Sequence, residues 1–131
     1  MKKILLLLII GGALFMASCT KQYNQVVPNQ TLTADLASSD WTTDDNGLNY
    51  TTTVDPPKGG DFGSSSDGIL IYLTVDGGKT YEQVPEVYNN VSYTYTNDGG
   101  VVTLYAQSAN GAETIPVPPP LGVKIIVVPS N

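Results

Sequence analysis

Alternation of apolar and polar side chains with a period of two is the feature that most restricts the fold of this chain. It runs from residue 30 to residue 128, where Thr, Val, Ile and Tyr are abundant and the 3.6-residue period of a helix is missing. The pattern predicts short strands at residues 31–37, 41–43, 48–54, 68–75, 80–84, 91–96, 101–107 and 122–128. We therefore expect an all-β fold, an antiparallel β-sandwich of about seven to eight short strands (Ig-like or jelly-roll-like), with a closed barrel as the alternative.

Turn sequences separate these strands. They are DDNG at 44–47, DGGK at 76–79 and NDGG at 97–100. Asn46 and Gly47 are suited to the positive φ angles of a tight hairpin turn, which would pair residues 41–43 with 48–54. Residues 68–75 and 122–128 are apolar on both faces, so we expect these two strands to be buried.

Two segments interrupt the alternation. Residues 55–67 form a long loop in which Phe62 is the only large apolar side chain, and the composition favours disorder over a functional loop. Residues 116–120 (PVPPP) predict stiff polyproline II. We interpret this segment as a rigid connection into the last strand, the alternative being a docking motif for a proline-recognition module.

The start of the chain has the organisation of a bacterial lipoprotein leader. Lys2 and Lys3 come first, followed by the apolar run 4–10, and small residues lead to Ser18 and Cys19, which is the only cysteine. The run is shorter than the roughly 18 residues that span a bilayer as a helix. Cleavage between Ser18 and Cys19 would leave Cys19 with a diacylglyceryl group and an N-acyl chain such as palmitate, a stable anchor. The alternative is an ordinary secretory signal in which the cysteine is incidental.

This leader divides the chain into three predicted parts: a helical signal peptide at 1–18, a lipidated polar tether at 19–29 and a β-sandwich domain at 30–131. Thr20 follows the cysteine where Asp would indicate retention at the inner membrane, so we expect the bacterial outer membrane. Residues 21–25 have no acidic cluster that would indicate export to the surface. We therefore favour the periplasmic face over the cell surface.

Charge and composition exclude several classes of function. Removal of Lys2 and Lys3 with the leader leaves four lysines against twelve acidic residues, a formal net charge of −8 with no arginine. Binding to nucleic acid depends on basic side chains, so we expect none. The chain has no histidine, which excludes Ser-His-Asp and Cys-His catalysis and imidazole ligands for zinc. We expect no enzymatic activity and no cofactor beyond the lipid on Cys19.

Aromatic residues are the candidates for ligand contact. Trp41 is the only tryptophan and would stack on a sugar ring if it were exposed, although a single Trp in a small sandwich is usually a core residue. Tyr93 and Tyr95 lead a group of strand tyrosines that would form a platform for carbohydrate or peptide on one sheet face. The alternative for these tyrosines is cross-strand packing. A carbohydrate-binding surface lipoprotein is the second hypothesis for the function.

Loop carboxylates are the candidates for calcium binding. They form two groups, one with Asp44, Asp45 and Asn46 and the other with Asp55, Asp61 and Asp67. Neither group has the spacing of a known calcium loop, so solvated carboxylates are the default interpretation. The sequence does not indicate which two carboxylates would form the catalytic pair of a glycoside hydrolase.

The whole pattern resembles small Bacteroidota outer-membrane lipoproteins of uncharacterised function. The resemblance rests on the leader, the SDW sequence at 39–41, the GILIYL strand at 68–73, the Val84-Pro85 step and the VKIIVVP sequence at 123–129. It implies a lipid-anchored envelope β domain and supplies no active site. We expect a binding, accessory or structural module, which would contact the membrane through its lipid and an envelope protein complex or a glycan through its domain.

Overall fold

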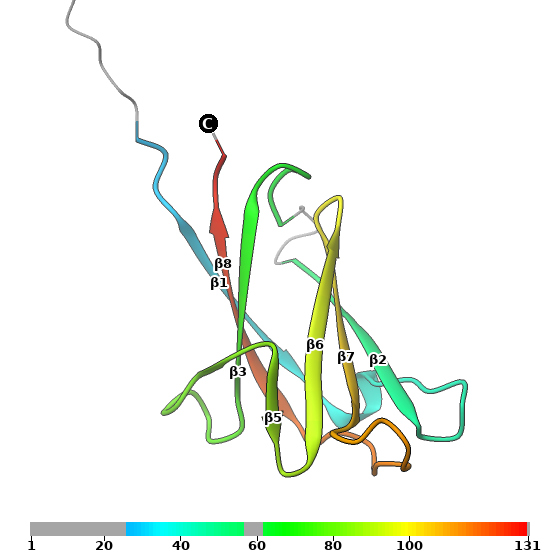
Figure 1. Cartoon of the computed structure of the whole chain (residues 1–131). Helices are drawn as coiled ribbons and strands as arrows, with labels where there is room; N and C mark the ends of the chain where they lie inside the picture. Colours follow the sequence, from blue (N-terminus) through cyan, green and yellow to red (C-terminus); the bar gives the residue numbers. More distant parts are fainter. Residues whose placement is uncertain (1–25, 57–61, 131) are drawn as a thin grey trace, which may run out of the picture.

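The computed structural model describes residues 26–56 and 62–130 of the 131-residue chain. These residues form two antiparallel four-stranded sheets (Figure 1). The strands are β1 (Gln30–Leu36), β2 (Asn49–Val54), β3 (Gly68–Thr74), β4 (Glu82–Gln83), β5 (Glu86–Tyr88), β6 (Val91–Asp98), β7 (Val101–Ser108) and β8 (Leu121–Val128), and one 3-10 turn spans Ser38–Asp40. The predicted all-β sandwich is confirmed. No helix in the described part of the chain is long and apolar enough to cross a membrane.

The two sheets combine distant parts of the chain. Sheet A has the strand order β1-β8-β3-β4 and sheet B the order β2-β7-β6-β5. Strands β1 and β2 from the start of the domain therefore pair with β8 and β7 from its end. Each sheet is therefore completed by a strand distant in sequence: β8 joins β1 to β3 in sheet A, and β7 joins β2 to β6 in sheet B.

Period-two alternation places one face of each sheet in the core, as predicted. In β8, Val123, Ile125 and Val127 are buried, and in β7 Val102 and Leu104 are fully buried. Strands β3 and β8 are interior strands of sheet A. Their opposite faces are half-buried or exposed, so the apolar side chains on those faces do not form a second core layer.

The predicted hairpin turns form. Asn46 and Gly47 have φ angles of 58° and 90°, and the hairpin that they close is fixed by an isolated bridge between Thr42 and Thr51. The Thr42 amide donates to the Thr51 carbonyl at 2.9 Å and the Thr51 amide donates back at 2.8 Å. The 41–43 segment therefore pairs with β2, although only through this one bridge.

The position of Phe62 contradicts the prediction that the whole loop at 55–67 is disordered. Residues 57–61 lie outside the described residues, but Phe62 is fully buried and its amide donates to the carbonyl of Gly100 at 3.2 Å. Asp67 holds the end of the loop, because its carboxylate accepts from the amides of Ser64 at 2.7 Å and Ser130 at 2.9 Å. The prediction of disorder is therefore wrong for residues 62–67, because one aromatic ring contributes enough apolar burial to hold a polar segment.

The proline-rich segment connects β7 in sheet B to β8 in sheet A, as predicted. Ile115 anchors its start: the side chain is buried, and the amide donates to the carbonyl of Gly47 at 2.9 Å. Strand β5 was not predicted. It follows Pro85 directly, and only three residues pair with β6.

Candidate functional site

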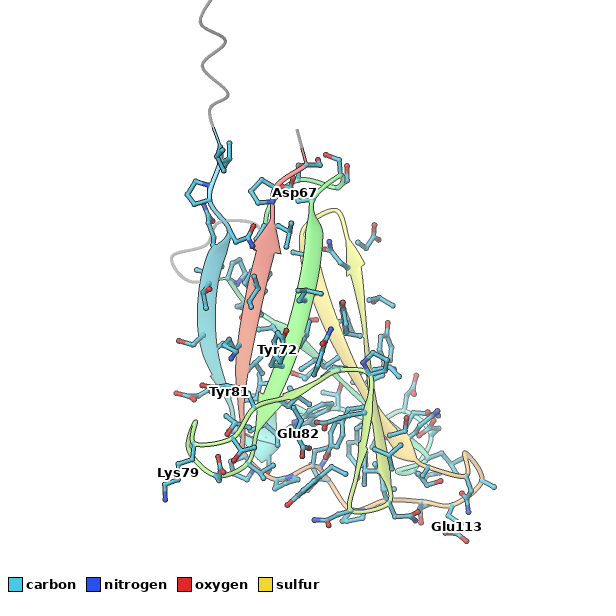
Figure 2. The ribbon with its side chains drawn as sticks, turned by 60° about the vertical axis from the view of Figure 1, so that its left-hand side comes forward. Asp67, Tyr72, Lys79, Tyr81, Glu82 and Glu113 are labelled. Carbon is cyan, nitrogen blue, oxygen red and sulfur yellow. The ribbon has the colours of Figure 1, made fainter. Side chains whose placement is uncertain are left out.

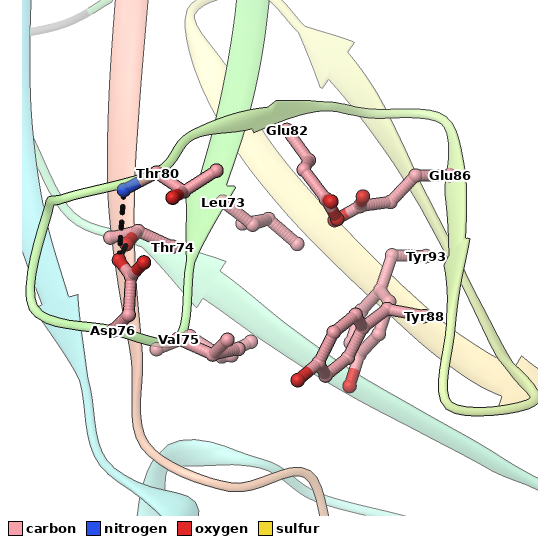
Figure 3. Close-up of a pocket in the computed structure, with 10 residues that line it drawn as sticks. Leu73, Thr74, Val75, Asp76, Thr80, Glu82, Glu86, Tyr88 and Tyr93 are labelled. Carbon is pink, nitrogen blue, oxygen red and sulfur yellow. Dashed lines mark hydrogen bonds between the residues drawn. The ribbon is translucent and has the colours of Figure 1, made fainter.

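The chain crosses from sheet A to sheet B between β4 and β5, and this crossover builds the most distinctive site of the domain. Val84 lies in the core, and its amide donates to the carbonyl of Ile71 at 2.9 Å. The Val84–Pro85 peptide bond is cis. The buried Val84 fixes the crossover, so the residues on either side of it, Glu82 and Glu86, are held at the facing edges of the two sheets (Figure 3).

The carboxyl groups of Glu82 and Glu86 meet across this gap (Figure 3), where one donates a hydrogen bond to the other when it is protonated. Burial, the hydrogen bond with Glu82 and the negative charge of Glu82 together raise the pKa of Glu86 to about 7, with burial as the largest cause. Two carboxylates at this distance repel each other unless one proton lies between them. Near neutral pH the pair therefore shares a proton.

Two tyrosines lie beside the carboxyl pair. Tyr88 on β5 is half-buried, and Tyr93 on β6 is only 3% exposed and packs edge-on against Trp41, with the ring centroids 6.4 Å apart. Burial raises the pKa of Tyr93, and the charge of Glu86 and the neighbouring Tyr88 raise it further. The Tyr93 hydroxyl therefore stays protonated and is both a donor and an acceptor at neutral pH.

The turn from β3 to β4 closes the other side of the site. Asp76 holds this turn, because its Oδ1 accepts from the Thr74 hydroxyl at 2.8 Å and from the amides of Lys79 and Thr80 at 3.0 and 2.9 Å. These bonds lower the pKa of Asp76, so its carboxylate stays ionised. The turn is thereby a fixed wall rather than a free loop.

Together these elements enclose a cavity of about 310 Å³, which we call the Glu82–Glu86 pocket. Its lining combines an apolar floor with carboxyl and hydroxyl groups: Leu73, Thr74, Val75, Asp76, Thr80, Glu82, Glu86, Tyr88, Tyr93 and Leu121. A second cavity of about 320 Å³, lined in part by residues 114–119, shares Tyr88 and Tyr93 with it. Tyr88 and Tyr93 therefore line both cavities.

The carboxyl pair does not have the spacing of a glycosidase. Such enzymes separate their two carboxyl groups by about 5–5.5 Å or about 6.5–9.5 Å, which leaves room for the sugar or for a water molecule. Glu82 and Glu86 are in hydrogen-bonding contact. The arrangement is suited instead to holding a proton or an exchangeable cation between two negative groups.

The aromatic residues predicted to stack on a ligand lie in the core. Trp41 and Tyr93 are 5% and 3% exposed, so neither offers an open ring face to a sugar. Tyr95 is half-buried, and its hydroxyl donates to the Ile69 carbonyl at 2.6 Å. The predicted carbohydrate platform is therefore corrected to a packed aromatic cluster, because these side chains point between the sheets rather than outward. The structure nevertheless brings Tyr93 to the wall of the pocket.

Two of the loop carboxylates proposed for calcium, Asp45 and Asp67, are engaged in hydrogen bonds within the protein. Asp45 accepts from the amide and side chain of Asn49 at 2.8 and 2.6 Å, and Asp67 accepts the amides named above. These bonds lower the pKa of both carboxyls. Within residues 26–56 and 62–130 no group of three or more His, Cys, Asp or Glu side chains is placed to hold a metal ion. Asp61, and the predicted lipidation site at Ser18 and Cys19, lie outside the described residues.

Sequence reasoning missed Glu82 and Glu86. The only signal was the spacing of two glutamates across the Val84-Pro85 step, since a proline there interrupts a strand. Comparison with models of known protein families, with curated proteins and with solved structures finds no match to this chain.

Proposed function

We propose that this protein is a lipid-anchored binding module of a bacterial outer membrane, with the Glu82–Glu86 pocket as its binding site. The pocket is the observation that carries the binding role, because it joins two close carboxyl groups, Glu82 and Glu86, to a buried tyrosine in one cavity. Sites for small ligands have this form, a mainly apolar hollow with a few polar groups. Catalysis is not part of the proposal, since the Glu82–Glu86 pair is closer than the two carboxyl groups of a glycosidase.

The leader supports the anchoring part of the proposal. A basic start, a short apolar run and small residues lead to the only cysteine of the chain, Cys19. A mature domain of net charge −8 would be repelled by anionic lipid headgroups, so a covalent lipid would be its means of membrane attachment.

The position of the pocket fits such an anchor. Strand β1 starts at Gln30, which pairs with Val127, and ends at Leu36, which pairs with Leu121. Leu121 lines the pocket, so the pocket lies at the opposite end of the sheet from Gln30, about 20 Å away at 3.3 Å per residue. Figure 1 shows the tail before β1 leaving the sandwich at the end away from β5. A lipid at Cys19 would thus leave the pocket open toward the compartment.

Fractionation of cells that express the full chain tests the anchor. The Ser18→Ala variant keeps a small residue before the cysteine, so we expect it to incorporate labelled palmitate and to sediment with the outer membrane. The Cys19→Ala variant should incorporate no label and should leave the membrane fraction. Normal processing and membrane retention of Cys19→Ala would contradict the proposal.

Fluorescence of Trp41 tests the carbohydrate alternative. Because the indole is buried, we expect a blue-shifted emission that no added glycan changes. A shift or quenching that saturates with one glycan would reinstate the carbohydrate-binding hypothesis.

A further inference from the structure

We propose that the Glu82–Glu86 pocket binds an ammonium group carried on a short aliphatic stem. This inference rests on the proposed binding function and names the chemical class of the ligand. Its elements are two opposed carboxyl groups, one buried tyrosine hydroxyl and an apolar floor, all lining one cavity.

The carboxyl pair lacks a counter-charge from the described protein. Burial and Glu82 are what raise the pKa of Glu86, and no lysine acts on it. Lys124 is engaged on the outer face of sheet A, where its Nζ lies 4.0 Å from the ring centroid of Tyr81 and 4.8 Å from that of Tyr72. Figure 2 labels these two tyrosines. An ammonium ion entering the pocket would replace the shared proton and supply the missing positive charge.

The Tyr93 hydroxyl is a second polar group that a ligand in the pocket would meet. Among the described residues, the hydroxyls of Tyr95 and Tyr105 have protein partners at 2.6 and 3.4 Å, whereas Tyr93 has none. Tyr93 is 3% exposed and extends into the pocket beside Tyr88 (Figure 3). The hydroxyl oxygen is accessible from the cavity, so it can hydrogen-bond to a molecule that enters. A phenol oxygen accepts a hydrogen bond from an ammonium group.

The size and floor of the pocket favour a small ligand with an aliphatic part. A volume of about 310 Å³ is at the lower end for small-molecule sites. Leu73, Val75 and Leu121 would contact methylene groups while the charged end reaches the carboxyl pair. The same chemistry is present in a free alkylamine and in a lysine side chain of another protein, and the experiment distinguishes these two sources.

Calorimetric titration of the purified full chain with n-pentylamine tests the proposal, with pentan-1-ol as the uncharged control. At pH 8 we expect the amine to bind about 10- to 100-fold more tightly than the alcohol, the range of a hydrogen bond to a charged group. Glu86→Gln should weaken amine binding by at least about tenfold. Asp98→Asn removes the same charge from the exposed β6–β7 hairpin and should leave the affinity unchanged.

Lower pH should weaken amine binding, because protons compete with the ammonium for the pair. The titratable groups that face Glu86 in the pocket are Glu82 from β4, Asp76 from the turn before it, Tyr88 from β5 and Tyr93 from β6. Of these groups, Glu86 has its pKa raised to about 7, so affinity should fall between pH 8 and pH 5.5. An affinity that is constant over this range would contradict the assignment to the pair.

A second titration, with Nα-acetyl-lysine-N-methylamide, distinguishes a free alkylamine from a protein lysine as the source of the ammonium group. Binding at least as tight as that of pentylamine supports a protein lysine as the ligand, and weaker binding supports a free amine. Equal binding of amine and alcohol, or no saturable binding of either amine at millimolar concentration, would overturn the proposal. The comparison of amine with alcohol uses the unmodified protein, so its result does not depend on whether a variant folds. The titration is also independent of the membrane anchor, which the Cys19→Ala variant tests separately.

Discussion

Replacing Phe62 with alanine removes the largest fully buried side chain of the described residues. The ring belongs to a loop of otherwise polar composition and lies in the core between the two sheets. If this burial holds the loop to the domain, the substitution should destabilise the fold as strongly as a change within a strand.

The magnitude follows from the burial. Transfer of a phenylalanine side chain from water to the core contributes about 1.5–3 kcal/mol, and the cavity left by truncation adds to the loss, so Phe→Ala substitutions cost about 3–5 kcal/mol. A domain of this size is stable by about 5–15 kcal/mol. We therefore expect Phe62→Ala to lose at least a fifth of the total stability and to lower Tm by at least about 12 °C.

Urea unfolding followed by Trp41 fluorescence measures this loss, since the only tryptophan is buried in the same core. The matched control is Val87→Ala, because Val87 is 63% exposed on β5 and its truncation should change the free energy of unfolding by less than about 0.5 kcal/mol. A loss below about 1 kcal/mol for Phe62→Ala would refute the reasoning, since it would mean that the ring is not held in the core.

Three further substitutions have defined outcomes. Glu86 has a pKa of about 7 in the folded state against an ordinary 4.5, so the free energy of unfolding should fall as the pH rises from 4.5 to 7. In urea denaturation, Glu86→Gln should raise the free energy of unfolding by about 1–2 kcal/mol at pH 8 and leave it unchanged at pH 4. Tyr95→Phe leaves the Ile69 carbonyl unpaired and should cost about 1–3 kcal/mol in the same assay. The pKa of Asp67 lies below its ordinary 3.8, so its contribution is complete above that pH and lost on acidification. Asp67→Asn should therefore lower Tm at pH 7 but not at pH 2, by calorimetry, and an equal loss at both pH values would contradict the role of its charge.

Local sequence predicted most of the strands and turns correctly, because the forces that select them act over a few residues. Alternation in 101–107 and 122–128 corresponds to β7 and β8, and Asn46-Gly47 adopts the expected positive φ angles. Composition alone also limited the chemistry of the site, since a chain without histidine or arginine must bind through carboxylates, lysines, hydroxyls and apolar surface.

Only the tertiary structure decided which side chains meet. On a continuous strand, Glu82 and Glu86 would be about 13 Å apart, four residues at 3.3 Å each. Their carboxyls touch because the chain changes sheets between them, and that change depends on Val84 being buried in a core made of strands distant in sequence. The burial of Phe62 and Trp41 was also decided by the tertiary structure. Their residue types allowed exposure or burial, and the space between two completed sheets determined that both rings are inside.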